Sequence, residues 1–133
     1  MITLEDVAAI ATGLPSVTEG VRHGHRTWTV AGKVFAWERP FSKADIKRFA
    51  GEPYPAGPII AISVEDLAEK EAVLAAHPKA FFTISHFDGY AAVLVELEAA
   101  RRQELEETLL DGWLACAPPA LVEAHSEALG LDG

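Results

Sequence analysis

The 133-residue chain lacks several features that define other classes of protein. Its single cysteine, Cys116, excludes an intramolecular disulfide. It has no run of about 18 apolar residues, which excludes a transmembrane helix. Its first residues also lack the basic and apolar regions of a secretory signal. We therefore expect a cytoplasmic protein that makes no membrane contact.

Composition is that of an ordinary globular protein. Half of the residues are hydrophobic and 23% are charged, which argues against a disordered chain. The length favours one domain, which we predict to span residues 1–133.

Basic residues are scarce and unevenly distributed. The chain has 11 Lys and Arg against 20 Asp and Glu, so its net charge is −9. Residues 20–50 nevertheless contain seven basic and two acidic residues. An acidic chain repels phosphate on average, but a locally basic segment can attract it. We predict weak, salt-dependent DNA binding by the seven, although they could instead be solvated or paired with carboxylates: Arg22, Arg26, Lys33, Arg39, Lys43, Lys47 and Arg48.

The first half of the chain reads as one helix followed by hairpins. Thr3 and Asp6 form a capping pattern for a helix over residues 4–13. Strands are expected near 18–23, 27–30 and 33–38, the last two joined by a tight turn at Ala31-Gly32. Alternation in the third strand places Phe35 and Trp37 on one face, with Val34 and Ala36 on the other. Residues 40–57 read as a loop, with a helical turn within residues 42–50.

The second half adds three strands and three helices. We expect strands over 59–62, 81–84 and 91–97, and a helix that Ser63 and Asp66 cap and Pro78 ends. Residues 101–116 form an amphipathic helix, and a final helix covers 120–129. Hairpin-linked strands in this order predict a two-layer α+β fold. Its antiparallel sheet has about five or six strands, with the helices packed on one face.

Motifs for chemistry are few. No nucleotide-binding loop or nucleophile motif is present, so we predict no cofactor and no catalytic residue. The pair His23 and His25 has a metal-ligand spacing, but two nitrogens do not complete a zinc site, and we predict no metal. A small-ligand pocket is predicted instead from one histidine of this pair and from the turn over residues 85–90: His23, His86, Asp88 and Tyr90. An enzyme would require His23, His86 and Tyr90 to converge in one concave pocket.

Several short motifs together resemble the MmcQ/YjbR family. They are Val30-Ala31-Gly32-Lys33-Val34-Phe35-Ala36, His86-Phe87-Asp88-Gly89-Tyr90, Asp111-Gly112-Trp113-Leu114 and Ala117-Pro118-Pro119. The resemblance covers about residues 4–123. It implies a frataxin-like (CyaY-like) fold and DNA binding by a "double wing" of β-hairpins, with no catalytic residues. The iron binding of frataxins is not carried over, because the first helix offers only Glu5 and Asp6.

A protein-interaction function is the alternative. The sheet face, or the loop over residues 40–58, would then contact a protein partner or a second copy in a homodimer. This alternative is based on fold analogy alone, which does not identify the partner.

Overall fold

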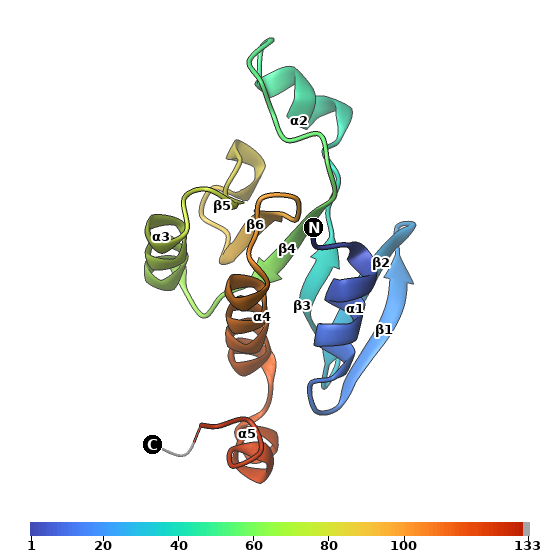
Figure 1. The fold of residues 1–133 in the computed structure, drawn as a ribbon, viewed down its shortest axis with the longest axis vertical. Coiled ribbons are helices and arrows are strands. Elements are labelled where there is room, and N and C mark those ends of the chain that lie inside the picture. The colour runs from blue at the N-terminus through green and yellow to red at the C-terminus, as the bar shows by residue number, and fades with distance from the viewer. Residues whose placement is uncertain (132–133) are drawn as a thin grey trace.

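The computed structural model describes residues 1–131 (Figure 1). Its elements, in chain order, are α1 (Leu4–Thr12), β1 (Val17–Arg22), β2 (His25–Val30), β3 (Lys33–Glu38), α2 (Lys43–Arg48), β4 (Ile59–Ser63), α3 (Leu67–Ala76), β5 (Phe81–Phe82), the 3₁₀ turn η1 (Ser85–Phe87), β6 (Ala92–Glu96), α4 (Arg102–Cys116) and α5 (Pro119–His125). None of the helices within residues 1–131 is both long enough and apolar enough to cross a membrane.

The strands form one antiparallel sheet in the order β1-β2-β3-β4-β6-β5. The main core lies between this sheet and the helices, where Trp28, Phe35 and Trp113 are fully buried. A smaller cluster, built around Ala61, Phe87 and Leu94, lies on the opposite face. We call this second face the open face, because η1 and the segment before α2 cover only part of it. The predicted two-layer α+β fold is confirmed.

Local capping signals place two helices as their sequences indicate. The Thr3 hydroxyl accepts the Asp6 amide while the Asp6 carboxylate accepts the Thr3 amide, which satisfies the first turn of α1. Ser42 and Asp45 make the same reciprocal pair at α2. The helical turn predicted within the basic loop is therefore a capped helix.

The predicted start of the third helix was wrong. Ser63 does not cap it; Asp66 does, and accepts the Glu69 amide at 2.8 Å. Ser63 instead ends β4, opposite Ala92, and its hydroxyl donates to the Val34 carbonyl oxygen at 3.2 Å. Sheet pairing thus continues through the residue that the local pattern had assigned to the cap.

Two further elements end at least two residues earlier than predicted. The strand expected over residues 81–84 is only Phe81–Phe82, because the chain turns back over the open face, where Ile84 joins the smaller cluster. The last helix covers Pro119–His125 rather than 120–129. A proline at the first helical position has no N–H to lose, so Pro119 starts this helix.

Helix α4 lies close to the sheet. The stripe Leu105, Leu109 and Trp113 faces the core, as its spacing predicts. Gly112 allows the approach, since a Cβ there would lie 2.8 Å from Ile62 Cγ2 and 2.9 Å from the Ser63 carbonyl oxygen.

A β-bulge corrects the predicted faces of β3. Trp28 pairs with Ala36 while the next residue, Thr29, pairs with Val34, so Phe35 is the extra residue. Phe35 and Ala36 consequently both face the main core. Trp37, on the other side of the bulge, lies on the open face.

Candidate functional site: a groove on the open face of the sheet

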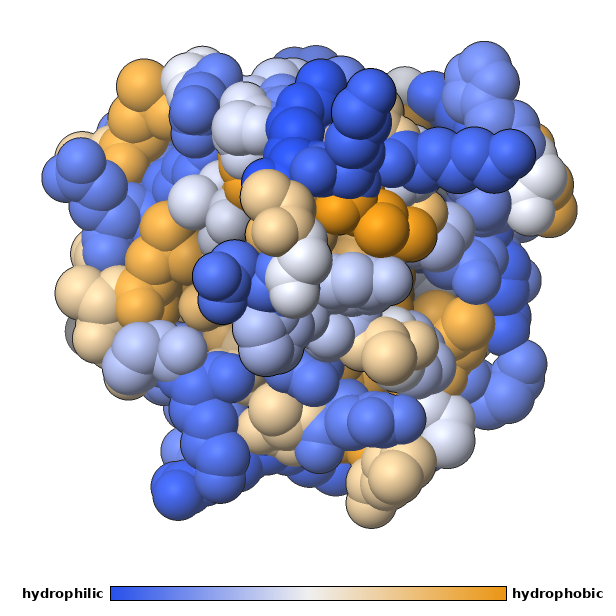
Figure 2. Space-filling view, turned by 90° about the horizontal axis from the view of Figure 1, so that it is seen from above, coloured by the Kyte–Doolittle hydropathy of each residue, from blue (hydrophilic) through white to orange (hydrophobic). Residues whose placement is uncertain are grey.

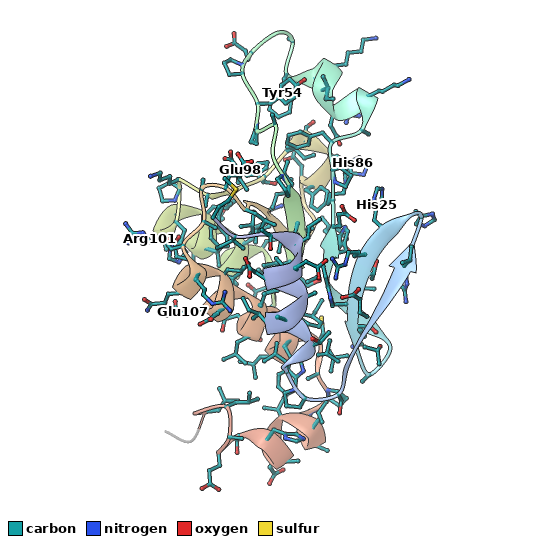
Figure 3. All side chains as sticks on the ribbon, turned by 45° about the vertical axis from the view of Figure 1, so that its right-hand side comes forward. His25, Tyr54, His86, Glu98, Arg101 and Glu107 are labelled. Carbon is teal, nitrogen blue, oxygen red and sulfur yellow. The ribbon has the colours of Figure 1, made fainter. Side chains whose placement is uncertain are left out.

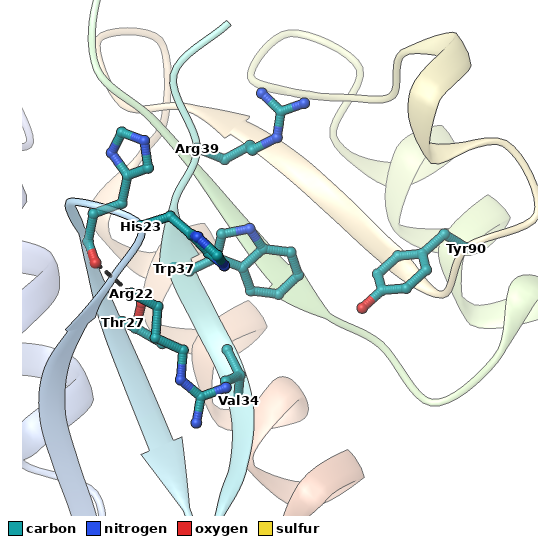
Figure 4. A pocket seen from close by; sticks show the side chains of 8 residues that line it. Arg22, His23, Thr27, Val34, Trp37, Arg39 and Tyr90 are labelled. Atoms are coloured by element: carbon teal, nitrogen blue, oxygen red, sulfur yellow. Dashed lines mark hydrogen bonds between the residues drawn. The ribbon is translucent and has the colours of Figure 1, made fainter. Parts of the chain in front are cut away.

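The open face carries two adjoining cavities, of about 370 Å³ and 230 Å³, that share Trp37, Arg39 and Tyr90. We call them together the open-face groove. The larger cavity is drawn in Figure 4 and is lined by Arg22, His23, His25, Thr27, Val34, Trp37, Arg39 and Tyr90. His86 and Phe87 complete the smaller one.

The β1–β2 turn supplies one wall. His23 and Gly24 both have positive φ, at 54° and 79°, which matches the two-residue turn favoured between twisted strands. Register then pairs Arg22 with His25 at the end of the hairpin. Side chains of two directly paired residues lie on the same face of the sheet. The turn therefore places Arg22, His23 and His25 along the groove.

The floor comes from β2 and β3. Thr27 pairs with Trp37 across the two strands, and both line the larger cavity. The bulge at Phe35 determines that the Trp37 indole lies here rather than in the main core. Trp28 and Trp113 are fully buried and donate their indole N–H groups to Glu19 and to the Pro15 carbonyl oxygen. Among the tryptophans, Trp37 therefore retains partial exposure.

The turn over residues 87–90 forms the opposite wall. Tyr90 is 55% exposed and faces Trp37 across the larger cavity, with its hydroxyl pointing into that space (Figure 4). Phe87 links them: its ring centroid lies 6.4 Å from that of Trp37 and 5.7 Å from that of Tyr90. The three rings therefore form one packed aromatic cluster.

Lys70 holds this turn in place from behind. The buried ammonium group donates to the carbonyl oxygens of Phe87 at 2.7 Å and Tyr90 at 2.9 Å. Burial lowers the pKa of Lys70, and the nearby charge of Asp88 opposes that effect. Asp88 is exposed and does not line the groove. Asp88 therefore acts on the charge of Lys70 and does not line the ligand pocket for which it was predicted.

Arg39 connects the groove to α2. Its guanidinium group lies 5.5 Å from the Phe87 ring centroid and 2.9 Å from Asp45 Oδ2. The Asp45 side chain is only 1% exposed and also pairs with Arg48 at 3.3 Å. Burial raises the pKa of Asp45, but hydrogen bonds from Ser42 and Arg39 outweigh it, so the pKa lies below its ordinary value. A buried carboxylate thus fixes the cation at the rim.

The seven predicted basic residues do not form a single patch. Arg22 and Arg39 line the groove. Lys43, Lys47 and Arg48 lie on α2 beyond it, at the end of the molecule viewed in Figure 2, where hydrophilic side chains cover most of the surface.

Arg26 and Lys33 lie elsewhere. Arg26 pairs with Glu5 at 2.6 Å and Glu19 at 3.2 Å, and its guanidinium lies 5.7 Å from the Trp28 ring centroid, on the helix side of the sheet. Lys33 is the first residue of β3 and lies beside the β2–β3 turn, at the end of the strands opposite to Arg22.

The predicted pocket residues are partly brought together. His23 and Tyr90 line the larger cavity, whereas His86 and Tyr90 line the smaller one. Figure 3 shows His25 and His86 on the same side of the molecule. The three residues of the enzyme alternative therefore border one groove without meeting in a single cavity. Among residues 1–131, no three His, Cys, Asp or Glu side chains are arranged to hold a metal ion.

Sequence reasoning missed Lys70 and Asp45. It considered Trp37 for stacking on a base only if exposed, and it expected this side chain in the core. Lys70 sits in a helix of mixed composition, where a lysine is normally exposed. Asp45 had one visible signal, the capping pattern with Ser42, which gives no hint of Arg39. Trp37 was hidden by the bulge, which breaks the alternation from which its face was predicted.

The fold and groove define a two-layer α+β protein with a cationic, aromatic site on the exposed part of its sheet. The family model described as YjbR matches residues 12–115. The chain therefore belongs to the YjbR family, as its motifs indicated.

Relatives and a solved structure agree with this assignment. The chain is 43% identical over 127 residues to the uncharacterized protein Rv2570 of Mycobacterium tuberculosis, covering 93% of this chain and 95% of the relative. The same values hold for the uncharacterized protein Mb2600 of Mycobacterium bovis. The crystal structure of Deinococcus radiodurans protein DR2400, with a DUF419 domain, matches with a TM-score of 0.64 and 19% identity. It covers 98% of this chain and 90% of that one. This last likeness shows the fold.

Proposed function

We propose that this protein is a non-catalytic module that binds the phosphates of nucleic acid at the open-face groove. The observation that supports the proposal is the charge of the residues that line the groove. Acidic residues outnumber basic ones in the chain by 20 to 11, yet the lining of both cavities, as formed by residues 1–131, contains no Asp or Glu. Arg22 supplies fixed positive charge. Arg39 pairs with Asp45, but Asp45 is shared with Arg48, so the two arginines together keep one net positive charge at the rim. Three histidines add donors.

The geometry supports a smaller contact set than the full basic segment. Arg39 lies at the rim, and α2 extends the positive surface with the exposed Lys43 and Lys47. Arg26 is excluded, because two carboxylates already neutralise it. The remaining body is strongly acidic, so it repels phosphate and confines an oligonucleotide to this face.

Salt dependence tests the proposal. Fluorescence anisotropy with a fluorescein-labelled oligothymidylate should show binding at low ionic strength. The logarithm of affinity should then fall with the logarithm of salt at a slope of about −1 to −3, for two to four contacted phosphates. Absence of binding at 20–50 mM salt, or a flat salt profile, overturns the proposal.

Two charge variants locate the surface. Arg22→Gln should weaken oligonucleotide binding. The slope of log affinity against log salt should also become shallower by about the contribution of one phosphate contact. Lys33→Gln removes the same charge from the far end of the same hairpin pair and should leave affinity nearly unchanged. Equal losses in the two variants would indicate general electrostatic attraction, and the groove would then not be the site.

A further inference from the structure

Building on the proposed function, we infer that the open-face groove accepts an unpaired base between Trp37 and Tyr90. The protein would thus bind single-stranded nucleic acid in preference to duplex. Two aromatic rings border the same cavity from opposite sides, one on the sheet and one on a turn (Figure 4). Cationic groups border that cavity at Arg22 and Arg39.

The groove has the size and composition for one base with its phosphate. Its larger cavity, of about 370 Å³, falls within the range of small-ligand pockets. Val34 and Trp37 give it an apolar floor. The Thr27 hydroxyl does not add a free polar group, because it donates a hydrogen bond to the His25 carbonyl oxygen at 3.1 Å. The floor therefore presents surface for stacking.

A duplex cannot use these rings. Bases in a duplex have their faces stacked on neighbours, and exposing one requires unpairing and flipping it, which costs free energy. A single strand offers its base faces freely, and aromatic stacking is tolerant of base identity. The same cations would bind phosphates of either form, so the aromatic pair is what distinguishes them.

The site is rigid where stacking requires rigidity. Lys70 fixes both ends of the turn that carries Tyr90, and the buried Phe87 ring packs beside both Trp37 and Tyr90. The Asp45 carboxylate fixes Arg39 at 2.9 Å. These contacts fix the aromatic turn and the rim cation before a ligand arrives, which reduces the entropy lost on binding.

Three probes test the inference by anisotropy competition at low salt, and the two single strands among them carry the same number of phosphates. They are a thymidine hexanucleotide, an abasic hexanucleotide with the same phosphates, and a six-base-pair hairpin duplex. The thymidine strand should bind about ten- to a hundredfold more tightly than the abasic strand, the ratio expected for stacking of one base. It should also bind more tightly than the duplex.

Ring variants separate stacking from other effects of the tyrosine. Tyr90→Leu should reduce thymidine-strand affinity about tenfold and leave the abasic strand unaffected, whereas Tyr90→Phe should retain the affinity of the unmodified protein. Tyr90 is exposed, so neither change should disturb folding. Binding should also quench tryptophan fluorescence, and Trp37→Phe should abolish that quenching while keeping an aromatic ring on the floor.

The outcomes distinguish this inference from the function on which it rests. Equal affinity for thymidine and abasic strands, or a Tyr90→Leu variant that binds as the unmodified protein does, overturns the unpaired-base site. Either result would leave the proposed phosphate binding through Arg22 standing. Failure of all three probes to bind overturns both.

Discussion

The ammonium group of Lys70, on α3, donates a 2.9 Å hydrogen bond to the carbonyl oxygen of Tyr90. A second bond reaches the Phe87 carbonyl oxygen at 2.7 Å. A lysine buried at 6% exposure thus ties the helix layer to the turn that forms one wall of the groove. Because the proposed binding site uses the same turn, we expect stability and binding to be coupled at this contact.

Replacing this lysine should loosen the turn. Lys70→Met retains much of the apolar stem but leaves two carbonyl oxygens without their charged donor, which should cost about 2 kcal/mol of unfolding free energy. Urea denaturation measures the loss, and oligonucleotide affinity should fall with it. Lys79→Met, at an exposed site, is the control and should change neither. A Lys70→Met protein with an unchanged urea midpoint would contradict the assigned role.

Asp45 should be far more important than an ordinary helix-capping aspartate. Its buried carboxylate pairs with two arginines, so Asp45→Ala should lower the unfolding free energy by about 3 kcal/mol. Asp66→Ala removes an exposed N-cap of α3 and should cost about 1 kcal/mol. Denaturant titration compares the two. Equal losses would mean that the arginine pairs add nothing beyond the cap.

Stability should fall in acid through Glu19. Its hydrogen bond from Arg26 lowers the pKa of Glu19 from the ordinary 4.5; burial opposes the shift, and the Trp28 hydrogen bond reinforces it. A carboxyl group whose pKa is lower in the folded state stabilises fully above its ordinary pKa and loses that contribution as pH falls through the folded value.

The Glu19→Gln variant isolates this pH dependence. The stability gap between the unmodified protein and the variant should be about 1 kcal/mol near pH 7, a modest value because the side chain is one-third exposed. It should shrink below pH 4.5. Thermal melts at several pH values test this, with Glu71→Gln on an exposed part of α3 as control. A gap that stays constant down to pH 3 would rule out Glu19 as the titrating group.

Gly112→Ala should destabilise the protein although alanine favours helices. Helix propensity alone predicts a gain of about 1 kcal/mol. The added Cβ would meet Ile62 Cγ2 at 2.8 Å and the Ser63 carbonyl oxygen at 2.9 Å, and such overpacking costs about 1–3 kcal/mol. We expect a net loss of about 1 kcal/mol. Asp111→Ala, one residue away on the exposed side, should be neutral or slightly stabilising. A more stable Gly112→Ala would show that α4 can move away from the sheet.

Elements with strong local signals were predictable. A capping pair fixed the start of α1, the spacing of Leu105, Leu109 and Trp113 fixed the buried face of α4, and Ala31-Gly32 fixed a hairpin. Each of these signals acts over one or two turns of chain. The start of α3 was missed, because pairing of Ser63 with β6 overrode a capping pattern that was equally good locally.

Sequence by itself determined the fold class, the family and the concentration of basic residues in residues 20–50. Tertiary structure alone decided which of those residues share a surface. One extra residue at Phe35 turned Trp37 to the open face, and carboxylates distant in sequence neutralised Arg26. Periodicity and charge counts describe neighbours along the chain, whereas a bulge and a long-range ion pair depend on partners that only the folded sheet brings together.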